Sequence, residues 1–333
     1  MKNSMESLMK KKIYGCLAGG LIGDAMGAPV ENWHYSKIAE KYGTLDDFEG
    51  AGTDDSAVKL ILCDALINNG GHVTADEFAV SFLKFKEQYY ELFYIPVRNM
   101  VHKLEDDLVL PVYAGVGNMQ SSSSAMAISP MGIVNACDPR RAAIETYDVA
   151  GMVHAGDTTF CRDAACSMAA AVAEAMKSDA TIDSILAAST AFLHKKSSKL
   201  MLDLINEALQ KARELGTYEK YREWVYANRT CNVICDSRET VPATLALFYL
   251  AKGDPVQSII YGANFGRDAD TIASMIGAIA GAYKGIDAFR PEWVEKVEQN
   301  NNQESLINDL YNLVSDRMDE GRKILAQCEV LIK

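Results

Sequence analysis

Apolar residues recur at intervals of three and four positions along most of the chain, which is the period of an amphipathic or buried α-helix. No convincing alternation of apolar and polar residues runs longer than four positions, so the pattern gives no sign of a β-strand. We therefore predict an all-α protein with helices over residues 7–27, 54–69, 74–88, 139–150, 156–177, 181–194, 198–215, 240–251, 255–263, 268–284 and 303–328. Because no linker rich in Pro, Gly or Ser divides the chain, we expect one compact multi-helix domain over residues 1–333.

Two of these helices contain unusually many glycines. The first has Gly15, Gly19, Gly23 and Gly27, each four positions from the next, and the second has a Gly-Ala repeat over residues 277–285. A glycine inside a helix costs about 1 kcal/mol relative to alanine. A stripe of glycines is therefore expected where another backbone packs very closely against that face. We interpret the two helices as a tightly packed central pair that lies beside the functional site.

Composition and charge narrow the class of protein. Hydrophobic residues make up 49% of the 333 positions, which excludes a disordered chain. The 33 Lys and Arg against 45 Asp and Glu give a net charge of −12, which argues against a partner bound through nucleic-acid phosphates. The apolar run after lysines 10–12 is interrupted by Asp24, short of the roughly 20 apolar residues that span a membrane. We expect a cytoplasmic protein with no nucleic-acid and no membrane partner.

The segment 111–135 is the longest stretch without helical periodicity, and it contains four consecutive serines, Ser121, Ser122, Ser123 and Ser124. Long irregular segments inside a compact domain are often functional. Serine hydroxyls and exposed backbone N–H groups suit phosphates or sugar hydroxyls. A flexible surface loop explains the same composition equally well.

Two short segments concentrate oxygen ligands, each directly before an apolar helix. They read Gly-Thr-Asp-Asp-Ser over residues 52–56 and Gly-Arg-Asp-Ala-Asp-Thr over residues 266–271. Ordinary N-capping of the two helices is one explanation, although one Asp at each start would satisfy it. A cation site is the other, because clustered carboxylates repel one another and hard oxygen ligands select Mg²⁺, Mn²⁺ or Ca²⁺. If the segments are adjacent, they can hold two metal ions about 4 Å apart.

An ordered set of motifs over about residues 10–295 resembles the ADP-ribosylglycohydrolase family. The motifs are GCLAGGLIGDAMGAPVE (15–31), GTDDSA (52–57), a lone His154, ETVP (239–242) and GRDADTIASMIGAIAGAYKG (266–285). The resemblance implies a single all-α domain with a binuclear Mg²⁺ site, for which Mn²⁺ is a possible substitute. It also implies hydrolysis of a bond at C1 of a ribosyl group.

Carried over position by position, the resemblance assigns roles to individual residues. Glu31, at the end of its motif, is expected close to the metals and the reactive ribose, and either Glu31 or Asp55 is expected to act as the catalytic base. Asp24 is expected to support helix packing, and His154 is expected near the ligand. The implied metal ligands are Thr53, Asp54, Asp55, Asp268, Asp270 and Thr271.

Three departures from the family pattern bear on the substrate. Ser56 replaces a Thr that often ends the first motif, and GRDADT replaces the common GGDTDT, which introduces Arg267 and removes a hydroxyl at Ala269. The serine-rich stretch 122–127 stands where the family often has Gly-Asn-Gly followed by Ala-Met-Arg, and it ends in Ala127 instead of arginine. We expect the loop Ser121–Ser124, His154 and Arg267 to contact the substrate, with Arg267 supplying the positive charge for phosphate.

The leading hypothesis from the sequence is a metal-dependent hydrolase that removes ADP-ribose from an ADP-ribosylated protein. The altered loop keeps open a smaller ribosyl or nucleoside-type substrate. A third alternative is a non-catalytic member, since lens crystallins resemble this family. The six intact oxygen ligands favour an enzyme, and the sequence leaves the oligomeric state open.

Overall fold

The protein is described by a computed structural model over residues 7–300 and 303–332, so the ends of the expected 1–333 domain lie outside the described residues. Every regular element in those residues is a helix, apart from one isolated parallel bridge between Val116 and Ala155. The α-helices are α1 Leu8–Gly27, α2 Tyr35–Tyr42, α3 Asp54–Asn68, α4 Ala75–Tyr89, α5 Ile95–Glu105, α6 Ser129–Val134, α7 Pro139–Gly151, α8 Thr159–Ala175, α9 Ile182–Ala191, α10 Lys199–Leu215, α11 Tyr218–Asn228, α12 Ser237–Leu250, α13 Pro255–Ala263, α14 Ala269–Lys284, α15 Pro291–Asn300 and α16 Gln303–Ile332. The predicted all-α fold is confirmed.

The helices that the periodicity missed are short. Each of the eleven predicted segments contains a helix, with ends shifted by a few residues, whereas α2, α5, α6, α11 and α15 were not predicted. Helices of six to eleven residues complete few turns, so a period of 3.6 hardly repeats in them. The stretch 111–135, which has no helical periodicity, contains a 3-10 turn, Pro111–Tyr113, at its start and α6 near its end.

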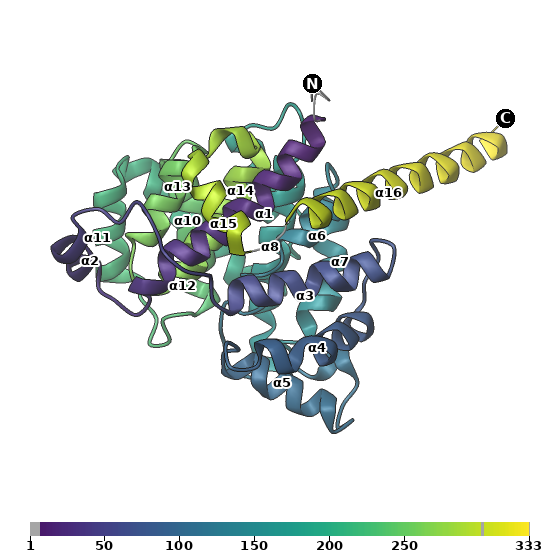
Figure 1. Ribbon diagram of the computed structural model, residues 1–333, viewed down its shortest axis with the longest axis horizontal. Coiled ribbons are helices and arrows are strands. Elements are labelled where there is room, and N and C mark those ends of the chain that lie inside the picture. The colour runs from purple at the N-terminus through teal and green to yellow at the C-terminus, as the bar shows by residue number, and fades with distance from the viewer. Residues whose placement is uncertain (1–6, 301–302, 333) are drawn as a thin grey trace.

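The central pair predicted from the glycines is confirmed. A Cβ built on Gly19 would lie 2.2 Å from the carbonyl oxygen of Gly277, and one on Gly281 would lie 1.9 Å from that of Gly15. Contacts along α1 therefore meet α14 in reverse order, so the helices are antiparallel. Figure 1 shows the two running side by side through the body of the molecule. Antiparallel packing brings the end of α1 to the beginning of α14.

A buried lysine ties the other end of this pair to α8. Lys12 is 5% exposed, and its ammonium donates to the carbonyl oxygens of Ala175 (2.7 Å), Lys177 (3.1 Å), Ala282 (3.1 Å) and Tyr283 (2.9 Å). Three of these carbonyls belong to the last turns of α8 and α14, and that of Lys177 lies just beyond α8. The C-terminal ends of helices leave unpaired acceptors and a partial negative charge. One cation thus caps two helices at once.

The first helix is apolar enough to raise the question of a membrane span. The segment Leu8–Val30 is long and apolar enough to cross a membrane by length and composition alone, but 83% of its most apolar stretch is buried inside the protein. Its glycine face packs against α14, as expected for a core helix. At the opposite end of the chain, α16 packs on the body up to Arg317 and then projects away from it (Figure 1).

Candidate metal centre

The crossing of α1 and α14 determines where Glu31 lies. After α1 the chain makes a 3-10 turn, Ala28–Val30, and then runs beside the segment that leads into α14. The N–H of Asn32 donates to the carbonyl oxygen of Arg267, and the N–H of Arg267 donates to that of Trp33, both at 2.8 Å. Asn32 (φ 65°) and Arg267 (φ 59°) are both left-handed, a conformation that costs a residue with a Cβ about 1–2 kcal/mol. The reciprocal hydrogen bonds hold both residues in it.

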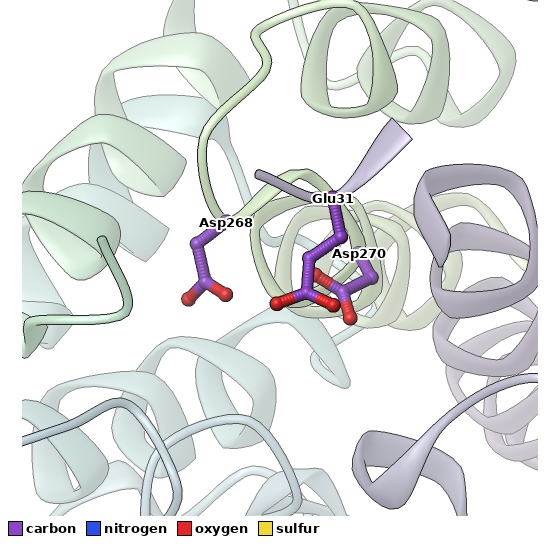
Figure 2. A group of neighbouring side chains, drawn as sticks. All are labelled: Glu31, Asp268 and Asp270. Atoms are coloured by element: carbon purple, nitrogen blue, oxygen red, sulfur yellow. The ribbon is translucent and has the colours of Figure 1, made fainter. Parts of the chain in front are cut away.

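Three carboxylates converge at this crossing. Ligand oxygens of Glu31, Asp268 and Asp270 lie within 4.8 Å of one another. Figure 2 shows the three side chains extending from the end of α1 and the start of α14 into a common space. Asp268 and Asp270 are buried, whereas Glu31 is half-buried and remains open to the cleft described below.

Asp24 positions the first acidic segment. Its carboxylate accepts from the N–H (2.9 Å) and hydroxyl (2.9 Å) of Thr53 and from the N–H (2.9 Å) and hydroxyl (2.5 Å) of Ser56. Asp24 is wholly buried in α1, so it anchors the beginning of α3 to the central pair. This contact specifies the packing role that the sequence implied for it.

Side-chain hydrogen bonds join the two acidic segments. The hydroxyl of Thr271 donates to Asp55 Oδ2 (3.1 Å), and the hydroxyl of Thr53, whose proton goes to Asp24, lies 3.4 Å from Asp270 Oδ2. The residues that the sequence singled out as metal ligands therefore line one cleft: Thr53, Asp54, Asp55, Asp268, Asp270 and Thr271.

Helix capping explains only part of this arrangement. Thr53 is the N-cap of α3 and accepts from the N–H of Asp55 (3.3 Å), but Asp268, the N-cap of α14, makes no capping bond with its side chain. The carboxylate of Asp54 accepts instead from the N–H of Tyr94 (2.9 Å). Asp55 Oδ1 and Asp270 Oδ1 are buried without a hydrogen-bond partner. Unpaired buried carboxylate oxygens fit a cation, because burial without a partner is costly.

The electrostatics of the cluster favour the same conclusion. Burial, followed by repulsion from neighbouring carboxylates, raises the pKa of Asp55 and of Asp270 well above the ordinary value. Burial raises the pKa of Asp54 to about 7 despite the hydrogen bond from Tyr94. Lys59 is a buried lysine whose charge interacts with Asp55, and its ammonium donates to the hydroxyl of Ser274 (2.9 Å). A divalent cation bound among these oxygens would offset the remaining repulsion.

The carboxylates line a cleft of about 510 Å³, a size typical of sites for small organic ligands. Ser122 and Ser123 line it, and the hydroxyl of Ser122 donates to Asp268 Oδ2 (3.0 Å). The other lining residues are Asn32, Gly52, Glu91, Leu92, Phe93, Tyr94, Ile95, Arg98, Met126, Ile234 and Cys235.

Other residues of the predicted substrate site lie behind the cleft wall. Ser121, Ser124 and His154 are buried and do not line the cleft. The hydroxyl of Ser121 contacts His154 Nε2 (3.0 Å), and that of Ser124 contacts His154 Nδ1 (2.8 Å). Burial lowers the pKa of His154 to about 3, so the imidazole is neutral. These contacts support the serine loop, which is buried and is not a flexible surface loop, whereas the substrate contacts expected of the three residues stay a prediction.

Arg267 is also absent from the cleft lining, because its guanidinium is bound elsewhere. It forms a two-pronged ion pair with the buried carboxylate of Glu239 and donates to the carbonyl oxygen of Cys231 (2.6 Å). The structure therefore places Arg267 outside the cleft lining, and the expectation that it contacts phosphate stays a prediction. The cation that does line the cleft is Arg98, which sequence reasoning missed because α5 gave no periodic signal.

Comparison with known proteins is consistent with this site. The ADP-ribosylglycohydrolase family model matches residues 5–320. The chain is 27% identical over 305 residues to the uncharacterized protein YegU of Escherichia coli, covering 84% of this chain and 90% of the relative. It is 23% identical over 352 residues to the ADP-ribosylhydrolase ARH3 of Gallus gallus, covering 91% of this chain and 94% of the relative. A solved structure described as an ADP-ribosylglycohydrolase-related protein complex has the same fold, with a TM-score of 0.71, 19% identity, and coverage of 93% of this chain and 100% of the other.

Proposed function

The chain belongs to the ADP-ribosylglycohydrolase family, and on that premise we propose that it is a metal-dependent hydrolase that removes ADP-ribose from a modified acceptor by cleaving the bond at C1 of the ribose. The observation that carries the proposal is the convergence of Glu31, Asp268 and Asp270 within 4.8 Å, beside the unpartnered oxygen of Asp55. Burial and mutual repulsion destabilise ionised carboxylates in this number and proximity, and a bound cation would offset that cost.

The donor set fits hard divalent cations, and two Mg²⁺ ions, with Mn²⁺ as a substitute, are the proposed cofactors. These ions prefer oxygen ligands, and here carboxylates and threonine hydroxyls supply them. The residues that would hold them are Thr53, Asp54, Asp55, Asp268, Asp270 and Thr271. When bound, such ions act as Lewis acids toward ribose oxygens and lower the pKa of water.

The side chains of this protein divide the remaining work. Glu31 is the half-buried member of the acidic group, so its carboxylate reaches the cleft and is assigned to accept a proton from the attacking water. Burial raises its pKa, which makes it a better base than an exposed glutamate. Asp55, the other candidate base, is 1% exposed and bound to Thr271, so it is assigned to the metals.

The proposed substrate is supported by the name of the avian relative, an ADP-ribosylhydrolase, and by the size of the cleft. A cleft of about 510 Å³ exceeds what a bare pentose needs and is in the range for larger organic ligands. The retained oxygen ligands disfavour a non-catalytic role. The cytoplasmic location and the absence of nucleic-acid or membrane partners stay predictions.

The experiment is a hydrolysis assay on the full chain with MgCl₂ or MnCl₂ and, in parallel, with a chelator. The substrates are peptides ADP-ribosylated through a nitrogen-linked or an oxygen-linked side chain, and nucleosides represent the smaller ribosyl compounds. Released ADP-ribose or free base is quantified by chromatography. We expect metal-dependent release of ADP-ribose, lost in Asp270→Asn. Asp254→Asn is the matched control, because Asp254 caps α13 outside the cleft.

The outcomes separate the alternatives. Release of base from nucleosides without release of ADP-ribose would move the protein to the smaller-substrate class. No turnover of any substrate, with metal binding absent as well, would leave the non-catalytic alternative. Loss of activity in Asp254→Asn equal to that in Asp270→Asn would show that the assay reports stability instead of the site.

A further inference from the structure

The charges that line the cleft are unevenly distributed. Six lining residues are acids: Glu31, Asp54, Asp55, Glu91, Asp268 and Asp270. Among the described residues that line it, Arg98 is the one cationic side chain. A lone arginine in an acidic cleft is expected to form an ion pair with one of those acids unless something else requires its charge.

Arg98 forms no ion pair with a described residue. Its guanidinium donates through Nη2 to the carbonyl oxygen of Glu91 (2.8 Å), lies over the ring of Tyr90 (5.3 Å to the centroid), and leaves Nε without a partner. By contrast, Arg267 and Arg317 are each paired with a carboxylate. Arg98 is thus oriented by a carbonyl and an aromatic ring, which restrict its position without neutralising its charge.

Arg98 also lies at a definite place relative to the acids. Tyr94 donates its N–H to Asp54, and Arg98 follows Tyr94 by four residues at the beginning of α5. Four residues of helix advance by about 6 Å, which is the distance along α5 from the backbone of Tyr94 to that of Arg98. The guanidinium of Arg98 turns back to the carbonyl oxygen of Glu91, before the start of α5. In a ribose 5-phosphate, the phosphorus is joined to C1 through the ring oxygen, C4, C5 and the ester oxygen, so the phosphate group lies several ångströms from C1.

We infer that Arg98 binds the phosphate of the substrate, so that the cleft selects a phosphorylated ribosyl compound of the nucleoside diphosphate type over an unphosphorylated one. The inference rests on the proposed function and deepens it. Guanidinium matches phosphate by two parallel hydrogen bonds, and among the described residues Nη2 of Arg98 has one acceptor and Nη1 has none, whereas Nε is buried. The charge on the substrate takes the place of the missing carboxylate partner.

The test is calorimetric titration of the full chain, in the presence of Mg²⁺, with ADP-ribose, ribose 5-phosphate and ribose. Arg98→Gln removes the charge and keeps a polar side chain. Arg162→Gln is the matched control, since the guanidinium of Arg162 also donates to a carbonyl oxygen, that of Tyr147 (2.9 Å), and lies over the ring of Tyr147, away from the cleft. Arg98→Lys keeps the charge without the paired geometry.

We expect Arg98→Gln to weaken ADP-ribose and ribose 5-phosphate by about tenfold to a hundredfold, in line with a charge-assisted hydrogen bond, and to leave ribose unchanged. The affinity of Arg98→Lys for ADP-ribose should lie between those of wild type and Arg98→Gln, and the affinity of Arg162→Gln should equal that of wild type. Equal affinity of Arg98→Gln and wild type for ADP-ribose would overturn the inference and leave the proposed function standing. An equal loss for ribose, or the same loss in Arg162→Gln, would overturn it too. If wild type binds no ADP-ribose, both the inference and the proposed function fail.

Discussion

Replacing Gly281 with alanine tests the packing on which the whole site depends. The added Cβ would lie 1.9 Å from the carbonyl oxygen of Gly15 and 2.3 Å from its carbonyl carbon, whereas ordinary contacts begin near 3.4 Å. Both atoms belong to the backbone of α1, so no side chain can rotate away. The helices must separate by roughly 1.5 Å at this point, or the chain must deform locally.

The magnitude follows from two opposing effects. Alanine improves the helix propensity of α14 by about 1 kcal/mol. Overpacking against a rigid neighbour costs typically 1–3 kcal/mol and more where backbone must move, and the separation also loses contacts along the glycine ladder. We expect Gly281→Ala to lower the free energy of unfolding by about 2–4 kcal/mol. Gly321 lies in α16 with nothing within 4 Å of an added Cβ, so Gly321→Ala should raise it by up to about 1 kcal/mol.

The assay is urea denaturation followed by far-ultraviolet circular dichroism, with the two variants and wild type measured side by side. Opposite shifts of the two midpoints are the expected result. If Gly281→Ala unfolds at the same urea concentration as wild type or at a higher one, the close backbone contact between α1 and α14 does not exist in solution. If Gly321→Ala is destabilised as well, the position of Gly281 has no special meaning.

Three further predictions concern the site and its supports. Adding Mg²⁺ to the chelated wild type should raise its melting temperature, because binding at a hundredfold excess over the dissociation constant adds about 2.7 kcal/mol to the free energy of unfolding. The melting temperature of Asp270→Asn should not rise. An equal rise in both proteins would show that Asp270 is not part of the metal site. Because burial lowers the pKa of His154 from 6.5 to about 3, the unfolded chain binds a proton that the folded chain does not, so stability is lost as pH falls from about 6.5 towards 3. The free energy of unfolding should fall by up to about 1.4 kcal/mol per pH unit in wild type, and this contribution should be absent in His154→Asn. If the urea midpoints of the two proteins change equally between pH 6.5 and 4.5, the prediction is refuted. Arg267→Gly removes the strain of a left-handed residue with a Cβ but leaves the buried carboxylate of Glu239 without its ion-pair partner, so the free energy of unfolding should fall by about 2–4 kcal/mol. Adding Glu239→Gln should restore most of that loss. An Arg267→Gly variant with the same urea midpoint as wild type would contradict this prediction.

Local pattern was enough for the features that depend on the immediate sequence. The period of apolar residues predicted the long helices, because a buried helical face needs an apolar residue every three or four positions. The spacing of Gly15, Gly19, Gly23 and Gly27 predicted a backbone contact, since glycine is costly in a helix unless another chain segment comes close. The two acidic segments stood out because ordinary capping needs only one acid at each helix start.

The approach of distant side chains was decided by the tertiary structure alone. Glu31 reaches Asp268 only because α1 and α14 are antiparallel, which neither helix encodes by itself. Arg267 and Arg98 are both arginines near the site in the fold, yet Glu239 binds Arg267, whereas no acid among the described residues binds Arg98. The orientation and the hydrogen-bond partners of a side chain depend on charged groups and packed side chains from segments that are distant in the sequence, and no short stretch of sequence contains that information.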